Sequence, residues 1–174
     1  MTTAYLRQDL ERDEGLRLTA YPDPDSPRGQ QLAKPPAKRV PGWETLPGAP
    51  WTIGYGHCGP EVHEGLVWTP DQAAGALAAD VAHACRLLDR NAAWWRDLND
   101  ARQDVLANLC FNMGWLNPAG THGLGTFRNT LAAIHRGDWQ AAHDGLTKSA
   151  WAREVGRRGA RLATQLLTGE RATA

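Results

Sequence analysis

Apolar residues recur at helical spacing along most of the chain. Near the N-terminus, Leu6 and Leu10 lie four residues apart, which predicts a helix over residues 4–14 that ends at Gly15. Five further helices are predicted after residue 69, at about 70–90, 100–113, 126–136, from 138 onward, and from 149 or 157 to 167. The helix from residue 100 has the broadest apolar face, which is typical of the central helix of a bundle.

Three of these predicted helices begin with capping residues. The sequence TPDQ at 69–72 is a capping box with proline at the first helical position. Asp100, followed by Gln103, predicts a second box. Asp138 predicts another N-cap, directly after Gly137 ends the preceding helix.

The segment between the first two helices has a different pattern. Residues 24–50 are rich in proline and glycine and have no period, which predicts a long loop, and WTIGYGHCG at 51–59 predicts a short strand running into a tight turn. We therefore expect an α+β, mainly α fold in a single domain over residues 1–174. Its small β-containing lobe spans about 15–68, and its larger helical lobe spans about 69–170 and includes the N-terminal helix.

Composition agrees with one compact domain that needs no disulfides, since 42% of the 174 residues are hydrophobic. The 19 basic and 19 acidic residues balance, which argues against a nucleic-acid partner. The charges are uneven, however: residues 1–27 carry six acids and three bases, and residues 148–174 carry six bases and two acids. This asymmetry indicates a polarised molecule or two segments that meet.

Cys58, Cys85 and Cys110 lack the spacing of a zinc site, and three thiols cannot all pair. They are predicted to be small buried hydrophobes in a reducing compartment, and no metal or cofactor is indicated. The N-terminal sequence has no apolar core of a signal peptide, and no apolar run approaches the ~20 residues of a membrane span.

Two carboxylates stand out near the first helix. Glu14 continues the apolar stripe of Leu6 and Leu10 and lies in the last helical turn, and both features disfavour its ionised form. A protonated carboxyl is what a general acid requires. Asp23 follows nine residues later and is held extended by Pro24. Two such acids across a cleft are the arrangement of glycosidases, although solvated surface charges would give the same pattern.

Several ordered motifs together resemble the phage-type lysozymes, the endolysins that cut bacterial peptidoglycan. They are DEGLRLTAYPDP at 13–24, TIGYGH at 52–57, FNMG at 111–114, FRNTL at 127–131, GDW at 137–139, KSAW at 148–151 and RRGAR at 157–161. The resemblance runs from about Leu6 to Leu167 and implies a lysozyme-like two-lobed fold.

The resemblance also implies the catalytic roles. Glu14 would be the general acid, Asp23 the carboxylate that positions water, and Thr52 a hydroxyl of the water site. Asp25 is a rival for Asp23, and the nine-residue spacing favours Asp23. The family is an inverting one, which needs the two carboxyl groups ~6.5–9.5 Å apart. Arg158 would lie against Glu14 and favour its ionised form, opposing the effects of burial and the helix end.

Supporting and substrate-binding positions follow from the same motifs. His57 is interpreted as structural and paired with an acid. Phe111 would line the cleft or belong only to the core, and Thr130 would contact substrate or bond its own helix backbone. Cys58 is expected to line the cleft without a chemical role. Gly145 stands where some relatives have an amide side chain, so that hydrogen bond is expected to be missing.

This chain departs from the simplest family pattern in having 28 residues between Asp23 and Thr52. The extra segment, 24–50, would line one side of the cleft, bind the anionic peptide stems of the bacterial cell wall, or be a surface loop without a function. Its length means that closeness of Thr52 to the carboxylates does not follow from the sequence.

The resemblance implies a muramidase endolysin that hydrolyses the β-1,4 bond between N-acetylmuramic acid and N-acetylglucosamine and so lyses the host. The alternatives are a lytic transglycosylase, which needs no water-positioning carboxylate, and a non-catalytic wall-binding or membrane-active protein. As an endolysin, the chain would act as a monomer on peptidoglycan. It would stay in the host cytoplasm until a holin-type partner released it to the periplasmic wall.

Overall fold

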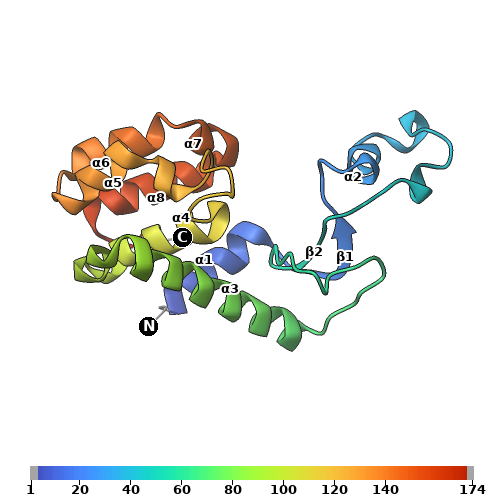
Figure 1. The fold of residues 1–174 in the computed structure, drawn as a ribbon, viewed down its shortest axis with the longest axis horizontal. Helices are drawn as coiled ribbons and strands as arrows, with labels where there is room; N and C mark the ends of the chain where they lie inside the picture. Colours follow the sequence, from blue (N-terminus) through green and yellow to red (C-terminus); the bar gives the residue numbers. More distant parts are fainter. Residues whose placement is uncertain (1–3, 172–174) are drawn as a thin grey trace. The chain divides into compact units, whose positions relative to one another are not determined.

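The computed structural model describes residues 4–171, and Figure 1 shows their order along the chain. The helices in this range are α1 (Ala4–Glu14), α2 (Pro27–Leu32), α3 (Pro70–Asn91), α4 (Asp100–Met113), α5 (Arg128–His135), α6 (Trp139–Thr147), α7 (Ala150–Val155) and α8 (Arg157–Thr168). Strands β1 (Arg17–Pro22) and β2 (Trp51–Gly54) form a two-stranded antiparallel sheet. The predicted α+β, mainly α class is confirmed. Across residues 4–171, no helix is long and apolar enough to cross a membrane.

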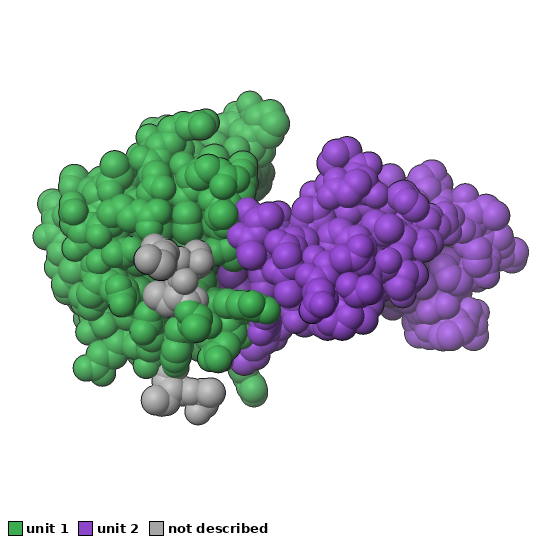
Figure 2. Space-filling model, turned by 90° about the horizontal axis from the view of Figure 1, so that it is seen from below, with its two compact units in different colours: residues 1–9, 81–174 green, residues 10–80 purple. Residues whose placement is uncertain are grey.

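The chain divides into two compact units, coloured separately in Figure 2. One unit contains residues 10–80, and the other contains residues 1–9 and 81–174. The division falls inside α1 and α3, so both helices contribute residues to both units.

The core of the 1–9 and 81–174 unit is built around α4. Val105, Leu106 and Leu109 of this helix are at most 1% exposed, as are Leu162 and Leu166 of α8. Helix α8 packs against α4, α6 and α7, and α6 also packs against α5. The broad apolar face predicted for α4 is therefore the buried centre of this unit.

Most of the predicted helix starts are confirmed. The Thr69 hydroxyl accepts a hydrogen bond from the Gln72 N–H at 3.2 Å, and the Gln72 side chain accepts one from the Thr69 N–H at 2.8 Å. This reciprocal pair satisfies two backbone donors at the start of α3. Asp138 likewise caps α6 by accepting from the Ala141 N–H at 3.1 Å.

The predicted cap of α4 was one residue too late. Asn99, not Asp100, is the N-cap, and its side-chain oxygen accepts from the Arg102 N–H at 3.1 Å. Gln103 therefore forms no capping box with Asp100, and its amide donates instead to the carbonyls of Arg96 and Leu98. Asn and Asp cap equally well, so composition does not choose between adjacent positions.

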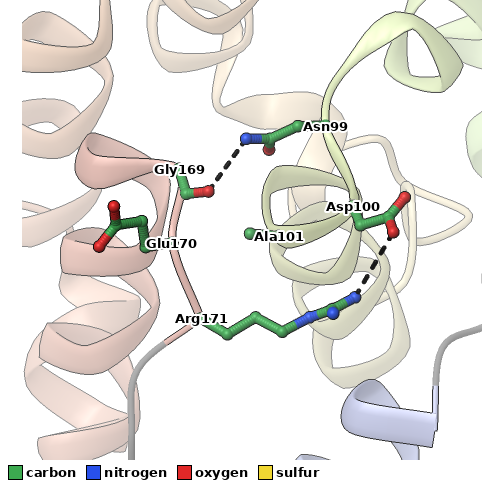
Figure 3. A pocket seen from close by; sticks show the side chains of 6 residues that line it. All are labelled: Asn99, Asp100, Ala101, Gly169, Glu170 and Arg171. Carbon is green, nitrogen blue, oxygen red and sulfur yellow. Dashed lines mark hydrogen bonds and ion pairs between the residues drawn. The ribbon is translucent and has the colours of Figure 1, made fainter.

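The end of the described chain returns to this cap (Figure 3). Gly169 ends α8 with φ 73°, and its carbonyl accepts from the Asn99 side chain at 2.9 Å. Arg171 pairs with Asp100 at 3.9 Å and donates to Asp104 at 3.0 Å. These contacts fix the end of α8 against the start of α4.

The basic C-terminal segment contains both helices that the sequence left as alternatives. Helix α7 begins after Ser149, whose hydroxyl accepts from the Ala152 N–H, and α8 begins at Arg157. Gly156 separates them with φ 56°, a conformation that a residue with a side chain rarely adopts.

In the 10–80 unit, the prediction that residues 24–50 form a loop without regular structure was wrong in part. Ser26 caps α2, with Pro27 at the first helical position, and Arg39 donates to the carbonyls of Gln31 and Leu32 at the other end of that helix. Short 3₁₀ turns follow at Pro36–Lys38 and Trp43–Thr45. The segment is therefore an ordered insertion, held by its own side-chain contacts and by the pairing of Arg28 with Glu64.

Candidate active site

The antiparallel sheet determines where Thr52 lies relative to Asp23. Thr52 pairs with Tyr21, and Trp51 pairs with Pro22, so the chain returns from the insertion directly beside the end of β1. Asp23 is the residue that follows β1. Thr52 therefore lies opposite a residue only two positions before Asp23, despite the 28 residues between them in the chain.

Asp23 is held by both ends of the insertion. Its backbone N–H donates to the Pro50 carbonyl at 2.9 Å and to the Gly48 carbonyl at 3.2 Å. One of its carboxylate oxygens accepts from the Asp25 N–H at 2.7 Å, which is an Asx turn. Asp25 is exposed, whereas Asp23 is half-buried. Asp25 thus helps to hold Asp23 in place, and the choice of Asp23 over its rival stays a prediction.

Glu14 is the last residue of α1 and is half-buried, as its position on the stripe of Leu6 and Leu10 predicted. The turn after β2 lies against it: a Cβ added to Gly56 would be 3.4 Å from Glu14 Oε2. Gly56 has φ 83°, a left-handed conformation suited to glycine. The TIGYGH segment thus brings both Thr52 and the turn beside Glu14 into one part of the unit.

Tyr21 is a further residue of this site that the sequence analysis did not single out. Its pKa is raised, mainly by burial and also by the nearby Glu14 and Cys58, while Arg17 and a hydrogen bond with Thr52 act in the opposite direction. The Arg17 guanidinium lies 4.4 Å from the centre of the Tyr21 ring. Because β1 ends at Pro22 and was not predicted, only its place two residues before Asp23 could have drawn attention to Tyr21.

His57 supports the turn from the other side. Its Nδ1 lies 2.7 Å from Asp80 Oδ2, and its Nε2 lies 2.7 Å from Glu61 Oε1. Burial lowers the pKa of His57, but the hydrogen bonds to Glu61 and Asp80 outweigh burial and raise it overall. The backbone of His57 also exchanges two 2.9 Å hydrogen bonds with Ile53. Both ring nitrogens are engaged, which agrees with the structural interpretation of this histidine.

The three cysteines are free thiols in two different environments. Cys85 and Cys110 are buried, as predicted, and burial raises the pKa of the Cys110 thiol to about 12. Cys58 is exposed, so the expectation that it is a buried hydrophobe was wrong. It follows His57 in the turn and is one of the groups that raise the pKa of Tyr21.

The remaining candidates belong to the other unit. Phe111 is half-buried, Thr130 is 7% exposed, and Arg158 donates two hydrogen bonds to the side-chain oxygen of the buried Asn108, at 3.0 and 2.8 Å. A Cβ on Gly145 would overlap Thr130 Oγ1, so a larger residue at 145 does not fit this packing. Substrate contact by Phe111 and Thr130, and an Arg158–Glu14 pair, stay predictions.

The 10–80 unit thus combines a carboxyl group, a second carboxylate and a hydroxyl. A carboxyl can protonate a leaving oxygen, and a carboxylate beside a hydroxyl can hold and activate a water molecule. Among the described residues, no group of three or more His, Cys, Asp or Glu side chains could hold a metal ion.

Comparison with known proteins relates this chain to one family. The family model described as phage lysozyme matches residues 38–167, which include Thr52, His57 and Arg158 but begin after Glu14 and Asp23. The pre-baseplate central spike protein Gp5 of Enterobacteria phage T4 is 28% identical over 167 residues, covering 92% of this chain. The chain spans 27% of the length of that protein.

Proposed function

The chain belongs to the phage lysozyme family, a family of glycosidase-type enzymes, and we propose that it hydrolyses the β-1,4 bond between N-acetylmuramic acid and N-acetylglucosamine in peptidoglycan. The observation that supports this proposal is the pairing of Thr52 with Tyr21, because it returns the chain to a position opposite a residue only two places before Asp23. The position of Glu14 against Gly56 of the same segment supports it further.

In the proposed reaction, Glu14 gives its proton to the glycosidic oxygen as that bond breaks. Asp23 and Thr52 hold a water molecule on the opposite face of the sugar, and Asp23 accepts a proton from the water as it attacks the anomeric carbon. This single displacement inverts the anomeric configuration. Tyr21 pairs with Thr52 across the sheet and would help to hold the hydroxyl of the water site in place. In this proposal Arg158 lies against Glu14, and Phe111, Thr130 and Cys58 contact the sugar chain.

The test is Glu14→Gln, which removes the acidic proton and keeps the shape of the side chain. We expect hydrolysis of purified peptidoglycan to fall by about 10²–10⁴-fold, the usual contribution of a general acid, with an unchanged thermal midpoint. Glu11→Gln, one turn earlier in α1, is the matched control and should retain activity. Wall clearing that survives Glu14→Gln would exclude this mechanism and favour a non-catalytic wall-binding or membrane-active protein.

A lytic transglycosylase would cut the same bond with one acid and no attacking water. The half-buried Asp23 beside Thr52 favours hydrolysis over this alternative. Mass spectrometry of the released fragments separates the two reactions, because a hydrolysed end is heavier than an anhydro end by one water.

The biological role has two candidates. The motif resemblance favours an endolysin that a holin-type partner releases from the host cytoplasm at lysis. The similarity to a central spike protein favours wall cleavage by a component of a phage particle. Mass spectrometry of purified particles distinguishes them: detection of the chain in particles supports the second role, and its absence together with failed lysis after deletion supports the first.

A further inference from the structure

The ordered insertion and the β1–β2 sheet line a small open cavity within the 10–80 unit. Ala20 and Pro22 of β1 and Trp51 of β2 line one side, and Leu32 and Trp43 of the insertion line the other. The cavity volume is about 400 Å³, within the range of about 300–1,000 Å³ that is typical of small-ligand sites.

This cavity lies on the face of the sheet opposite Tyr21 and Thr52. Side chains alternate along a strand, so Pro22 points away from the side that Tyr21 occupies. Trp51 pairs with Pro22, and Thr52 pairs with Tyr21, so each pair shares a face. The cavity is therefore distinct from the proposed water site.

The walls of the cavity are held in place by the protein itself. Arg28 donates to the Leu46 carbonyl at 2.8 Å, pairs with Glu64, and lies 5.4 Å from the centre of the Trp51 ring. Trp43 is covered on one side by the Arg39 guanidinium at 4.7 Å. A cavity that is ordered in advance binds with a smaller loss of conformational entropy.

The charges of the lining decide which ligand fits. Arg28, Glu44 and Glu64 give the lining one positive and two negative groups, which disfavours an anionic peptide stem. A purely apolar ligand would remove water from the charged groups of the rim without offering them a hydrogen bond, which costs free energy. A neutral ring with flat C–H faces and polar edges can pack on two indoles and hydrogen bond to the charged rim.

We propose that this cavity binds an N-acetylhexosamine unit of the wall glycan, as a second saccharide site built by the insertion. The proposal rests on the proposed function for its substrate class. Trp43 and Trp51 would pack against the faces of the sugar ring, and Arg28, Glu44 and Glu64 would bind its hydroxyl and acetamide groups. The insertion would then hold the enzyme on a glycan strand between cleavage events.

The test uses chitotetraose and the Glu14→Gln protein, so that the ligand is not consumed. NMR spectra of the indole N–H groups should show saturable shifts of Trp43 and Trp51 during the titration. Trp43→Ala should weaken binding about tenfold, as read at the remaining Trp51 signal, and Trp43→Phe, which keeps an apolar ring in the insertion, should weaken it less. Trp94→Ala is the matched control and should leave the Trp43 and Trp51 shifts unchanged, since Trp94 stacks on His135 in the other unit.

Three outcomes would overturn the inference. They are no shift of either indole, equal affinity in Trp43→Ala, or a response to an isolated anionic peptide stem but not to chitotetraose. The titration of the intact indoles does not depend on whether a variant folds. Hydrolysis by the unsubstituted protein is measured in parallel, so that failure of the second site and failure of the proposed function give separate results.

Discussion

The His57–Asp80 pair makes a prediction that ties the stability of the 10–80 unit to pH. The substitution is Asp80→Asn, which keeps the size of the side chain and removes its charge. His57 lies 2.7 Å from Asp80, and their side chains are 17% and 32% exposed. A hydrogen bond to a charged group contributes about 1.5–3 kcal/mol, and an exposed ion pair contributes about 1 kcal/mol or less. For this partly buried pair we expect a loss of about 2 kcal/mol at pH 5.5–6.

The direction in which the unfolding free energy changes with pH follows from the direction of the His57 pKa shift. The pKa of His57 is raised in the folded protein, so protonation stabilises the fold. This contribution is fully present below the unfolded-state pKa of about 6.5 and is lost as the pH rises through the folded-state pKa. The difference in unfolding free energy between the native protein and Asp80→Asn should therefore be largest near pH 5.5–6 and smaller at pH 9.

The assay is urea denaturation at a series of pH values, with an NMR titration of His57 in both proteins. Glu61→Gln is the comparison variant, because Glu61 contacts the other ring nitrogen and is far more exposed, at 57%. It should cost less stability than Asp80→Asn at every pH. A constant difference between pH 5.5 and 9, or a His57 pKa that Asp80→Asn does not lower, would refute the reasoning.

Three further predictions concern packing and the water site. Gly29→Ala would place a Cβ 2.8 Å from the carbonyl carbon of Asp23. We therefore expect the rate of hydrolysis to fall at least tenfold. The unfolding free energy, measured by denaturation, should fall by about 1–3 kcal/mol. Gly145→Ala should cost a similar amount of stability because its Cβ overlaps Thr130 Oγ1, and adding Thr130→Ala should restore part of the loss. Tyr21→Phe removes the hydroxyl of the residue that pairs with Thr52 and should lower kcat up to about tenfold with little change in KM; equal kcat values would remove Tyr21 from the mechanism.

The helices were predictable because their information is local. The Thr69–Gln72 box, the Asp138 cap and the stop at Gly15 each depend on residues within one or two helical turns, and all three occur as expected. The wrong N-cap predicted for α4 also concerns neighbouring residues only. Asn99 and Asp100 are both good capping residues, and the sequence does not show which of the two is the N-cap.

The insertion was less predictable because its order depends on distant partners. Ser26 and Pro27 form a recognisable helix start, yet α2 has only six residues and would be marginal alone. Its stability comes from contacts such as Arg28 with Leu46 and Glu64, which are 18 and 36 residues away. The nearness of Thr52 to Asp23 also depends on a strand register formed after the insertion returns, and spacing in the sequence does not reveal it.

The backbone hydrogen bonds at the base of the insertion explain how a long segment can stand between two proposed catalytic residues without separating them. The Asp23 N–H bonds to the carbonyls of Gly48 and Pro50, so the two ends of the insertion meet at the point where it leaves β1. Closing a loop costs only about 0.6 kcal/mol more for each doubling of its length, so the added residues oppose this closure weakly. The geometry at Asp23 and Thr52 is therefore determined by the base of the insertion. Its outer part is free to vary in sequence and to acquire the separate saccharide site proposed for Trp43 and Trp51.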